Sequence, residues 1–249
     1  MIRSVIVDAD IVAYQAATAC QSAVEWENDV WSMWGDAGEG FRTASAQVEN
    51  IANILNATKL TLCFTDGVNW RKEIMPEYKL SRSKKPKPMV LKQVREMLSK
   101  KYETFVKPTL EGDDVMGILA THPRLLPGER IVVTLDKDLQ GIPGLHVHMN
   151  DLTAAPKVVP EAEADHFHLL QSLSGDPTDG YPGCPGIGPK RAEAVLAGLT
   201  GKEAWAAIVA AYAKAGLNEE VALANARVAR ICRHTDFDFK TQRVKLWTP

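Results

Sequence analysis

Three segments with the pattern of a buried strand each end on a carboxylate, and this repetition constrains the fold of the chain most. SVIVD ends at Asp8, KLTLCFTD ends at Asp66 and RIVVTLD ends at Asp136. Helix-spaced apolar segments separate them, and this alternation predicts an α/β fold with a mostly parallel sheet and helices on both faces. Ligands bind at the carboxyl ends of such strands, so we expect the three acids to lie near one another.

A fourth acidic segment, LEGDDVMGILA, places Glu111, Asp113 and Asp114 where an apolar, helix-spaced run begins. One explanation is structural, because acids in the first turn suit the positive end of a helix and cap its free N–H groups. The other is functional, because carboxylates this close repel one another unless a cation lies among them. Both explanations remain open for this segment alone.

Further acids follow the last of these strands and occur in a later turn. Asp138 lies two residues after Asp136, while Asp176 and Asp179 belong to SGDPTDGYPG. Ordinary turn chemistry is the alternative for the last two, because Asp before Pro or Gly is a common turn former. The nine candidate metal ligands are Asp8, Asp66, Glu111, Asp113, Asp114, Asp136, Asp138, Asp176 and Asp179.

This all-oxygen set suits Mg²⁺ or Mn²⁺ and disfavours zinc. Two such ions about 4 Å apart can activate a water and stabilise the leaving oxygen of a phosphodiester. The 249-residue chain carries a net charge of −2, so with these nine acids set aside the remainder is +7. A basic protein around an acidic pocket is suited to a polyphosphate substrate.

Other sequence features narrow the class of protein. No apolar run approaches the roughly 20 residues that span a bilayer, and MIRSVIVDAD lacks the layout of a signal peptide, so we expect a soluble, cytoplasmic protein with no membrane partner.

Four cysteines without C-x-x-C spacing argue against a zinc site or a disulfide framework and are expected to be buried free thiols. The segment from Arg71 to Lys87 holds seven Lys or Arg against two Glu, although basic runs are usually only solvated.

The segment AVEWENDVWSMW alternates around Asn28 and Asp29, which predicts a β-hairpin. We expect its tryptophans, Trp26, Trp31 and Trp34, to pack within the protein rather than to stack on bases.

A glycine-rich segment, GYPGCPGIGPKRAEAVL, predicts a second kind of phosphate contact. Gly186 and Gly188 suit a tight hairpin, and Pro189 suits the first turn of the helix that follows. Lys190 and Arg191 lie at the start of this helix, where backbone N–H groups also attract phosphate. Together they indicate a helix-hairpin-helix that holds a DNA backbone without reading its sequence.

The ordered set of motifs resembles the 5′-nucleases of the flap endonuclease superfamily, most of all the 5′→3′ exonucleases of short-tailed lytic bacteriophages. The resemblance spans nearly the whole chain and rests on VDAD, FTDGVNWRKE, PEYKLSR, LEGDDVMG, TLDKD, GDPTDG, GIGPKR, RICRHTDFDFK and LWTP. It implies a PIN-like nuclease domain over residues 1–159 and a helical region with the helix-hairpin-helix over residues 160–249.

The resemblance also assigns the acids to two metal regions. The first would comprise Asp8, Asp66, Glu111 and Asp113. The second would comprise Asp136, Asp138 and Asp179, with Asp113 lying between the two regions. Asp114 and Asp176 would support them, partly through water, whereas Asp10 is expected to cap a helix.

Basic and aromatic residues would contact the substrate. Lys79 and Arg82 lie three residues apart, so one helical face could present both to the scissile phosphate. By the same resemblance Tyr14 would stack on a base near the scissile bond, although a buried helix tyrosine is the alternative. Lys84 and Lys85 would add DNA contacts.

The function implied is a Mg²⁺-dependent 5′→3′ DNA exonuclease with 5′-flap endonuclease activity, in which Mn²⁺ can replace Mg²⁺. K⁺ would bind backbone carbonyls near Gly183 and Cys184. The substrates would be duplex ends, 5′ flaps and RNA–DNA hybrids, and the enzyme is expected to be a monomer that serves primer removal and DNA degradation in phage replication. The segment between Arg82 and Met89 is short and broken by proline, so the helical arch of fuller relatives is reduced or disordered, which leaves the balance of the two activities open.

Two alternatives come from other classes. A PIN-type ribonuclease would share the acids of the sheet but would not call for GIGPKR or for Asp179 just before it. A non-catalytic DNA-binding scaffold would keep the hairpin but could lose its carboxylates, all of which are present here.

Overall fold

The computed structural model of the chain describes residues 2–27, 31–83 and 86–249. Within these residues a six-stranded sheet has the order β5-β4-β1-β6-β7-β8. Its strands are β1 (Arg3–Asp8), β4 (Lys59–Cys63), β5 (Thr104–Phe105), β6 (Glu129–Thr134), β7 (Gly144–His148) and β8 (Lys157–Val159). All neighbouring pairs are parallel except β7 with β8, which confirms the predicted mostly parallel sheet.

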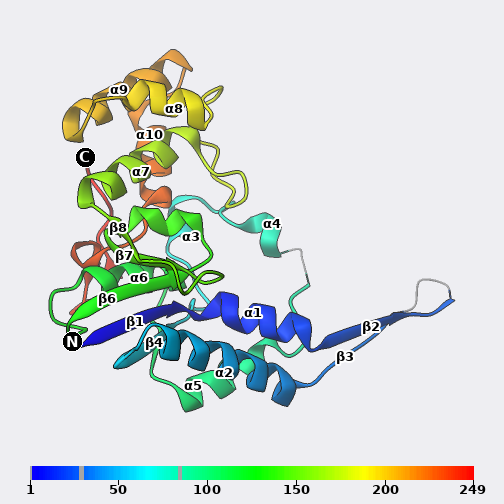
Figure 1. The fold of residues 1–249 in the computed structure, drawn as a ribbon. Coiled ribbons are helices and arrows are strands. Elements are labelled where there is room, and N and C mark those ends of the chain that lie inside the picture. The colour runs from blue at the N-terminus through cyan, green and yellow to red at the C-terminus, as the bar shows by residue number, and fades with distance from the viewer. Residues whose placement is uncertain (1, 28–30, 84–85) are drawn as a thin grey trace.

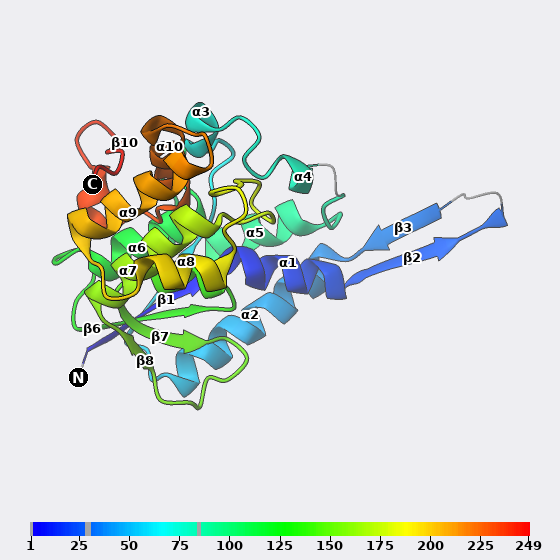
Figure 2. The same ribbon diagram turned by 90° about the horizontal axis from the view of Figure 1, so that it is seen from above.

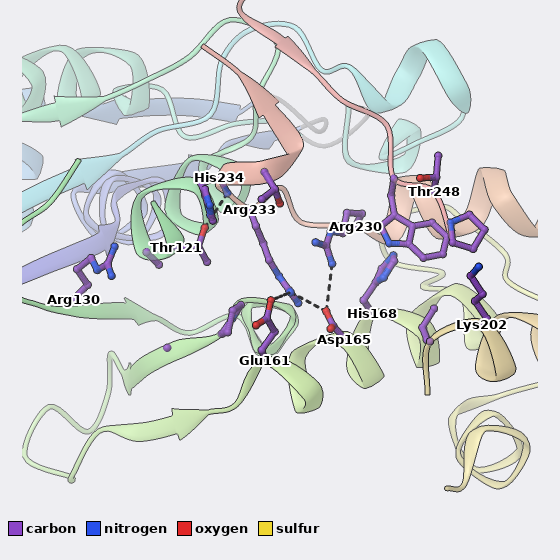
Figure 3. Close-up of a pocket in the computed structure, with 18 residues that line it drawn as sticks. Thr121, Arg130, Glu161, Asp165, His168, Lys202, Arg230, Arg233, His234 and Thr248 are labelled. Carbon is purple, nitrogen blue, oxygen red and sulfur yellow. Dashed lines mark hydrogen bonds and ion pairs between the residues drawn. The ribbon is translucent and has the colours of Figure 1, made fainter. Parts of the chain in front are cut away.

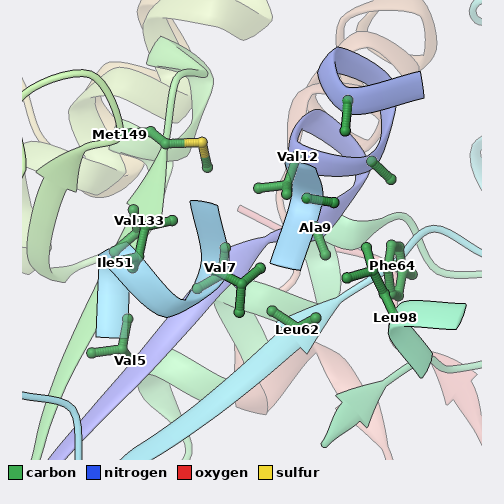
Figure 4. Close-up of a cluster of buried hydrophobic side chains, with 14 of the residues drawn as sticks. Val5, Val7, Ala9, Val12, Ile51, Leu62, Phe64, Leu98, Val133 and Met149 are labelled. Atoms are coloured by element: carbon green, nitrogen blue, oxygen red, sulfur yellow. The ribbon is translucent and has the colours of Figure 1, made fainter. Parts of the chain in front are cut away.

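The central strand β1 is buried on both faces, which is why its sequence is a continuous apolar run. Because side chains alternate across a strand, Val5 and Val7 enter one core while Ile6 enters the other. On the first face the sheet packs against α1 (Ala9–Ala19), α2 (Ala37–Ile54) and α5 (Leu91–Lys101), as Figure 4 shows for part of that core. On the second face it packs against α6 (Gly112–Thr121). Helices therefore cover both faces, as predicted.

The parallel register aligns the carboxyl ends of the strands along one edge of the sheet. Asp8 on β1 is opposite Cys63 on β4, and Val7 is opposite Val133 on β6. Short helical segments follow at this edge, namely α3 (Arg71–Ile74), α4 (Leu80–Ser83) and the 3₁₀ helix η2 (Lys137–Gly141). The chain thus brings the predicted acids to one side of the molecule.

The C-terminal helices gather at one end of the molecule (Figure 1). They are α7 (Glu161–Ser174), α8 (Pro189–Leu196), α9 (Gly201–Lys214) and α10 (Glu219–Ala229), and they share a hydrophobic core of their own. The chain then returns to the sheet through η3 (His234–Asp236), β9 (Phe237–Asp238) and β10 (Arg243–Val244). Cys232 and Phe237 of this returning segment belong to the same core as α6. A separate nuclease domain ending at residue 159 stays a prediction.

The strands β2 (Gln21–Glu25) and β3 (Trp31–Gly35) pair antiparallel and confirm the predicted hairpin. This hairpin projects far from the rest of the protein (Figures 1 and 2), and its predicted turn at Asn28 and Asp29 lies outside the described residues. Trp26 and Trp34 are 59% and 53% exposed, so the expectation that they pack inside the protein was wrong. A two-stranded ribbon without a second layer offers no core to bury them, and the side chain of Trp31 is not described.

The cysteine and membrane predictions have simpler outcomes. Cys63, Cys184 and Cys232 are buried free thiols as expected, whereas Cys20 is partly exposed. Among the helices of the described residues, none combines the length and apolar character needed to cross a membrane.

Candidate active site

Three acids from different segments meet at the carboxyl edge of the sheet. Asp8 ends β1, Asp113 lies in the first turn of α6, and Asp136 follows β6 and caps η2. Burial raises the pKa of Asp8 to about 7, and repulsion from Asp10 and Asp136 adds to this. Burial and then repulsion from Asp8 raise the pKa of Asp113 well above its usual value. These carboxylates therefore face one another, and among the described residues Lys79 offsets the charge of Asp113 only in part.

Asp8 is held in place by two hydrogen bonds. Its Oδ1 accepts from the backbone N–H of Ile11 at 3.3 Å and its Oδ2 accepts from the Thr134 hydroxyl at 3.0 Å. Asp8, not Asp10, thus caps α1, so the expected capping role of Asp10 was wrong. The Asp10 carboxylate instead accepts from the backbone N–H of Thr65 at 2.8 Å, which links α1 to the end of β4.

Asp114 is oriented away from these acids, into a buried ion pair. Arg71 donates from Nη1 and Nη2 to its two carboxylate oxygens at 2.7 and 2.8 Å. Trp70 Nε1 and the backbone N–H of Cys232 donate to the same carboxylate at 3.1 and 2.9 Å. Burial alone would raise the pKa of Asp114, but Arg71 outweighs it and the pKa is lowered. Asp114 is therefore fully engaged in holding α3, α6 and the C-terminal segment together, and its contact with a metal stays a prediction.

Arg71 was expected only as part of a solvated basic run, yet it is a buried side chain. Besides Asp114 it bonds the carbonyl oxygens of Val228 and Arg230 at 2.8 and 2.6 Å. Its Nη1 also donates to Glu111 Oε2 at 3.2 Å. The sequence signal was weak, because the partners of Arg71 lie 40 to 159 residues further along the chain.

Lys79 lies among the acids and compensates two of them. Its Nζ is 2.6 Å from Glu111 Oε1 and 3.3 Å from Asp179 Oδ2. Burial opposes ionisation of Glu111, but Lys79 and Arg71 outweigh it and lower the pKa of that carboxyl. Tyr78 donates its hydroxyl to Glu111 at 2.8 Å and also contacts Asp179 at 3.1 Å, so it bridges the two predicted metal regions.

The predicted helical face shared by Lys79 and Arg82 does not form. Lys79 precedes α4 and has a φ of +54°, a left-handed conformation that a helix excludes. Its backbone N–H donates to the carbonyl of Asp179 at 2.7 Å, so it is fixed to the later turn instead. The side chain of Arg82 and residues Lys84 and Lys85 lie outside the described part of the chain.

The second predicted region is built by η2, α7 and the following turn. Asp136 Oδ1 accepts from the backbone N–H of Asp138 at 2.8 Å, and Gln171 Nε2 donates to Asp138 Oδ1 at 2.8 Å. Burial raises the pKa of Asp138 to about 6, and repulsion from Asp136 and Asp176 contributes. Asp176 also accepts from the backbone N–H of Thr178 at 2.7 Å. Asp176 thus forms an ordinary turn hydrogen bond and also repels Asp138.

Asp66 follows β4, and Tyr14 lies on α1. The backbone N–H of Thr109 donates to Asp66 at 2.8 Å, and this bond is the main reason that its pKa is lowered. Tyr14 is 50% exposed on α1, so the alternative of a buried helix tyrosine is wrong. Its stacking on a base stays a prediction.

The predicted helix-hairpin-helix geometry is present between α7 and α8. Gly188 is the N-cap of α8, Pro189 occupies its first turn, and Gly186 has a φ of +75° that suits glycine. Lys190 and Arg191 are exposed at this helix start, and Arg191 Nη1 donates to the carbonyl of Gly186 at 2.7 Å. The start of α8 is therefore open to an anion, while K⁺ binding near Gly183 and Cys184 stays a prediction.

In the described residues, no three His, Cys, Asp or Glu side chains are already arranged to hold a metal ion. Two of the acids, Glu111 and Asp114, are instead neutralised by Lys79 and Arg71. Asp8 and Asp113 repel each other, and the attraction between Lys79 and Asp113 does not outweigh burial and this repulsion. A carboxylate-only group whose charge is not balanced fits a hard divalent cation such as Mg²⁺ or Mn²⁺.

Solved structures share the fold of this chain. Structures of the phage T5 flap endonuclease superpose with TM-scores of 0.65 and 0.64 at 17% and 18% sequence identity, covering 92% of this chain and 89% of theirs. One of them is a complex with DNA and metal ions, and the other was co-crystallised with metal ions. At this identity the likeness establishes the fold of a 5′-nuclease.

The chain belongs to the 5′–3′ exonuclease family, because residues 3–167 match the model described as the N-terminal resolvase-like domain of 5′-3′ exonucleases. The exodeoxyribonuclease of Enterobacteria phage T3 and the exonuclease of Escherichia phage T7 are each 29% identical over 98% of this chain, and cover 92% and 93% of their own lengths. A flap endonuclease Xni of Shewanella baltica is 31% identical over 53% of both chains. The predicted class, a 5′→3′ nuclease, is thereby confirmed.

Proposed function

We propose that this protein is a metal-dependent 5′→3′ DNA exonuclease that also cleaves 5′ flaps by a two-metal mechanism. The observation that carries the proposal is that Asp8, Asp113 and Asp136, from three separate segments at the carboxyl edge of the sheet, lie close enough for repulsion to add to the burial that raises the pKa values of Asp8 and Asp113. The names of the T3 and T7 relatives and of the Shewanella flap endonuclease support the two activities.

The acids would hold Mg²⁺, which Mn²⁺ could replace, and the second region would add Asp138 and Asp179. Bound ions would supply an activated water and stabilise the leaving oxygen of the phosphodiester. Tyr78 and Gln171 fix the carboxylates of Glu111, Asp179 and Asp138 by hydrogen bonds, which is the usual task of residues behind metal ligands. The metal-bound relatives from phage T5 support this assignment.

Lys79 would bring a positive charge to the scissile phosphate from within the acid cluster. Arg82 would assist it and Tyr14 would stack on a neighbouring base, for which its exposed position on α1 provides the surface.

The remaining contacts of the proposed complex come from the start of α8 and from the basic segment that holds Lys84 and Lys85. The start of α8, with Lys190 and Arg191, would bind the backbone of the duplex, and Lys84 and Lys85 would add electrostatic contacts. K⁺ would bind the hairpin near Gly183 and Cys184. In this proposal residues 1–159 form the nuclease domain and residues 160–249 the region that holds DNA.

We also propose a role in phage DNA replication, in which a monomer acting in the host cytoplasm removes primers and degrades DNA; that the T3 and T7 relatives are phage nucleases fits this role. RNA–DNA hybrids would then be substrates beside duplex ends and 5′ flaps.

The deciding experiment uses a duplex labelled at one 5′ end and, separately, a 5′-flap substrate, each with Mg²⁺ and with chelator. Metal-dependent release of mononucleotides or short oligonucleotides from 5′ ends is expected, and the products show which activity dominates. An RNA of the same sequence tests the ribonuclease alternative, which predicts cleavage of RNA in preference to DNA. Intact binding without cleavage of either DNA would support the scaffold alternative and contradict the proposal.

A further inference from the structure

A second cavity, of about 690 Å³, lies at the opposite edge of the sheet from the acids. It is bordered by Thr121 at the end of α6 and by Arg130 and Gly144 near the starts of β6 and β7 (Figure 3). Thr121 is eight residues beyond Asp113 on the same helix, which separates the two sites by about 12 Å along the helix axis alone. This cavity is therefore distinct from the proposed nuclease site.

The side chains that line the cavity carry an excess of positive charge. Its cationic side chains are Arg130, Lys202, Arg230 and Arg233, and its acidic side chains are Glu161 and Asp165. Arg230 and Arg233 are only 8% and 5% exposed, so both guanidinium groups are largely removed from water. Desolvated cations this close gain from an anion that enters the cavity.

Both arginines are paired with protein acids, and Arg233 also lies 3.7 Å from Glu161, so the free capacity of the pair is in unused N–H donors and not in unbalanced charge. Arg233 reaches Asp165 at 2.8 Å and the carbonyl of Gly141, and Figure 3 shows both arginines directed toward Asp165. Arg230 donates from Nε to Asp236 at 2.9 Å, but its Nη1 is 3.8 Å from Asp165, beyond hydrogen-bond distance. Burial and then repulsion from Arg230 lower the pKa of Arg233. The outer edge of Arg230 thus keeps donor capacity for a ligand.

An aromatic wall completes the cavity. The indole of Trp247 contacts the rings of His168 and Trp205 edge to face, with centroid separations of 5.0 and 5.3 Å. His168 Nε2 donates to the carbonyl of Ala226 at 2.8 Å, and burial lowers the pKa of this histidine to about 3, so it is neutral. His168 fixes the aromatic wall and adds no charge, and Trp247, which is partly exposed, lines the cavity.

We propose that this cavity binds a nucleoside 5′-monophosphate, with the phosphate at Arg230 and Lys202 and the base against Trp247. Guanidinium groups bind phosphate oxygens through paired hydrogen bonds, and an indole stacks with any base. The volume lies within the range of small-molecule sites, which is roughly 300–1,000 Å³. The site relies on none of the acids of the proposed nuclease centre.

The test is calorimetric titration of the full chain with dGMP, deoxyguanosine and inorganic phosphate, all with chelator present. The nucleotide is expected to bind at least about tenfold more tightly than either part. Lys202→Ala should weaken binding about fivefold or more, whereas Asp165→Asn should strengthen it, because it removes the carboxylate that competes for the arginines. Lys240→Ala, a matched change of an exposed lysine outside the cavity, should leave binding unchanged.

Absence of saturable binding of dGMP would overturn the proposal. Binding that is insensitive to both Lys202→Ala and Asp165→Asn would place the nucleotide elsewhere and overturn it as well. Phosphate binding as tight as that of dGMP would remove the role of Trp247 and with it the nucleotide assignment. Asp113→Asn in the nuclease centre should not alter dGMP binding, so failure of this proposal is distinguishable from failure of the proposed nuclease.

Discussion

Two groups of carboxylates share the acidic edge of the sheet and differ in how their charge is balanced. Glu111 and Asp114 are buried against Arg71 and Lys79, and their pKa values are lowered. Asp113 lies between them in the sequence, yet it faces Asp8 and its pKa is raised well above the usual value. One short motif thus supplies both groups, because adjacent residues in the first turn of a helix point in different directions.

The difference indicates a division of labour within the site. The compensated acids join α3, α6 and the C-terminal segment through Arg71, which contacts all three. These contacts of Arg71 fix the start of α6, so Asp113 stays close to Asp8 although the two carboxylates repel each other. Strain of this kind is maintained at functional sites when the surrounding structure is firmly fixed. Substitutions in the two groups of carboxylates should therefore have different consequences.

The largest effect is expected from Asp113→Asn, which keeps the shape of the side chain but removes the charge that faces Asp8. Cleavage of 5′-labelled duplex should fall by about three orders of magnitude or more, equivalent to about 4 kcal/mol. DNA binding should be retained, and the melting temperature in chelator should not fall, because ionisation of this buried carboxylate disfavours the folded state. A near-normal cleavage rate would remove Asp113 from the mechanism.

Arg71→Met tests the other group, because it leaves Asp114 buried without its partner. Loss of one member of a buried ion pair costs about 3–5 kcal/mol, so the free energy of unfolding in urea should fall by that amount. The double variant Arg71→Met, Asp114→Leu serves as the control and should recover much of the loss, since no unpaired charge remains. Equal stabilities of the single variant and the wild type would contradict the role of this pair.

The two groups should also respond oppositely to pH in metal-free protein. Above pH 4 the unfolded state releases the Asp8 proton, whereas the folded state keeps it until about pH 7, so stability should fall as the pH rises through this window. Asp8 alone corresponds to a loss of about 4 kcal/mol at most. The lowered pKa values of Glu111 and Asp114 act in the other direction, and their contribution is lost only as the pH falls below about 4.

Thermal unfolding in chelator from pH 4 to pH 8 measures this slope. Asp8→Asn should flatten it, and Mg²⁺ added at pH 7.5 should raise the melting temperature of the wild type more than that of Asp8→Asn. If the melting temperature of the wild type rose steadily between pH 4 and pH 7, repulsion between the carboxylates would not destabilise the fold.

The smallest effect is expected at the start of α8, outside both groups of carboxylates, and it concerns DNA binding. Lys190→Ala combined with Arg191→Ala should weaken duplex binding and reduce the slope of log K against log salt by about one to two units, because fewer counterions are released. Measurement in chelator separates binding from cleavage, and Lys240→Ala is the matched control. An unchanged slope would contradict the phosphate contact at the start of α8.

Some predictions from the sequence failed where a residue depends on distant partners. Arg71 was assigned to a solvated run, but it is buried by segments more than 150 residues away. Asp10 was expected to cap α1, a role that Asp8 takes, and the exposed Trp26 and Trp34 were expected in a core that the projecting hairpin does not have. Tyr78 was not recognised, although its place directly before Lys79 in PEYKLSR was a usable signal.

The sequence by itself determined which strands are followed by acids at the carboxyl edge of the sheet. Strand periodicity and alternation with helices require a parallel sheet, and a parallel sheet places the ends of β1, β4 and β6 along one edge with Asp8, Asp66 and Asp136. Only the tertiary structure decided which acids are neutralised. The charge state of a carboxylate depends on its burial and on cations within a few ångströms, and here those cations, Arg71 and Lys79, come from segments that only folding brings to α6.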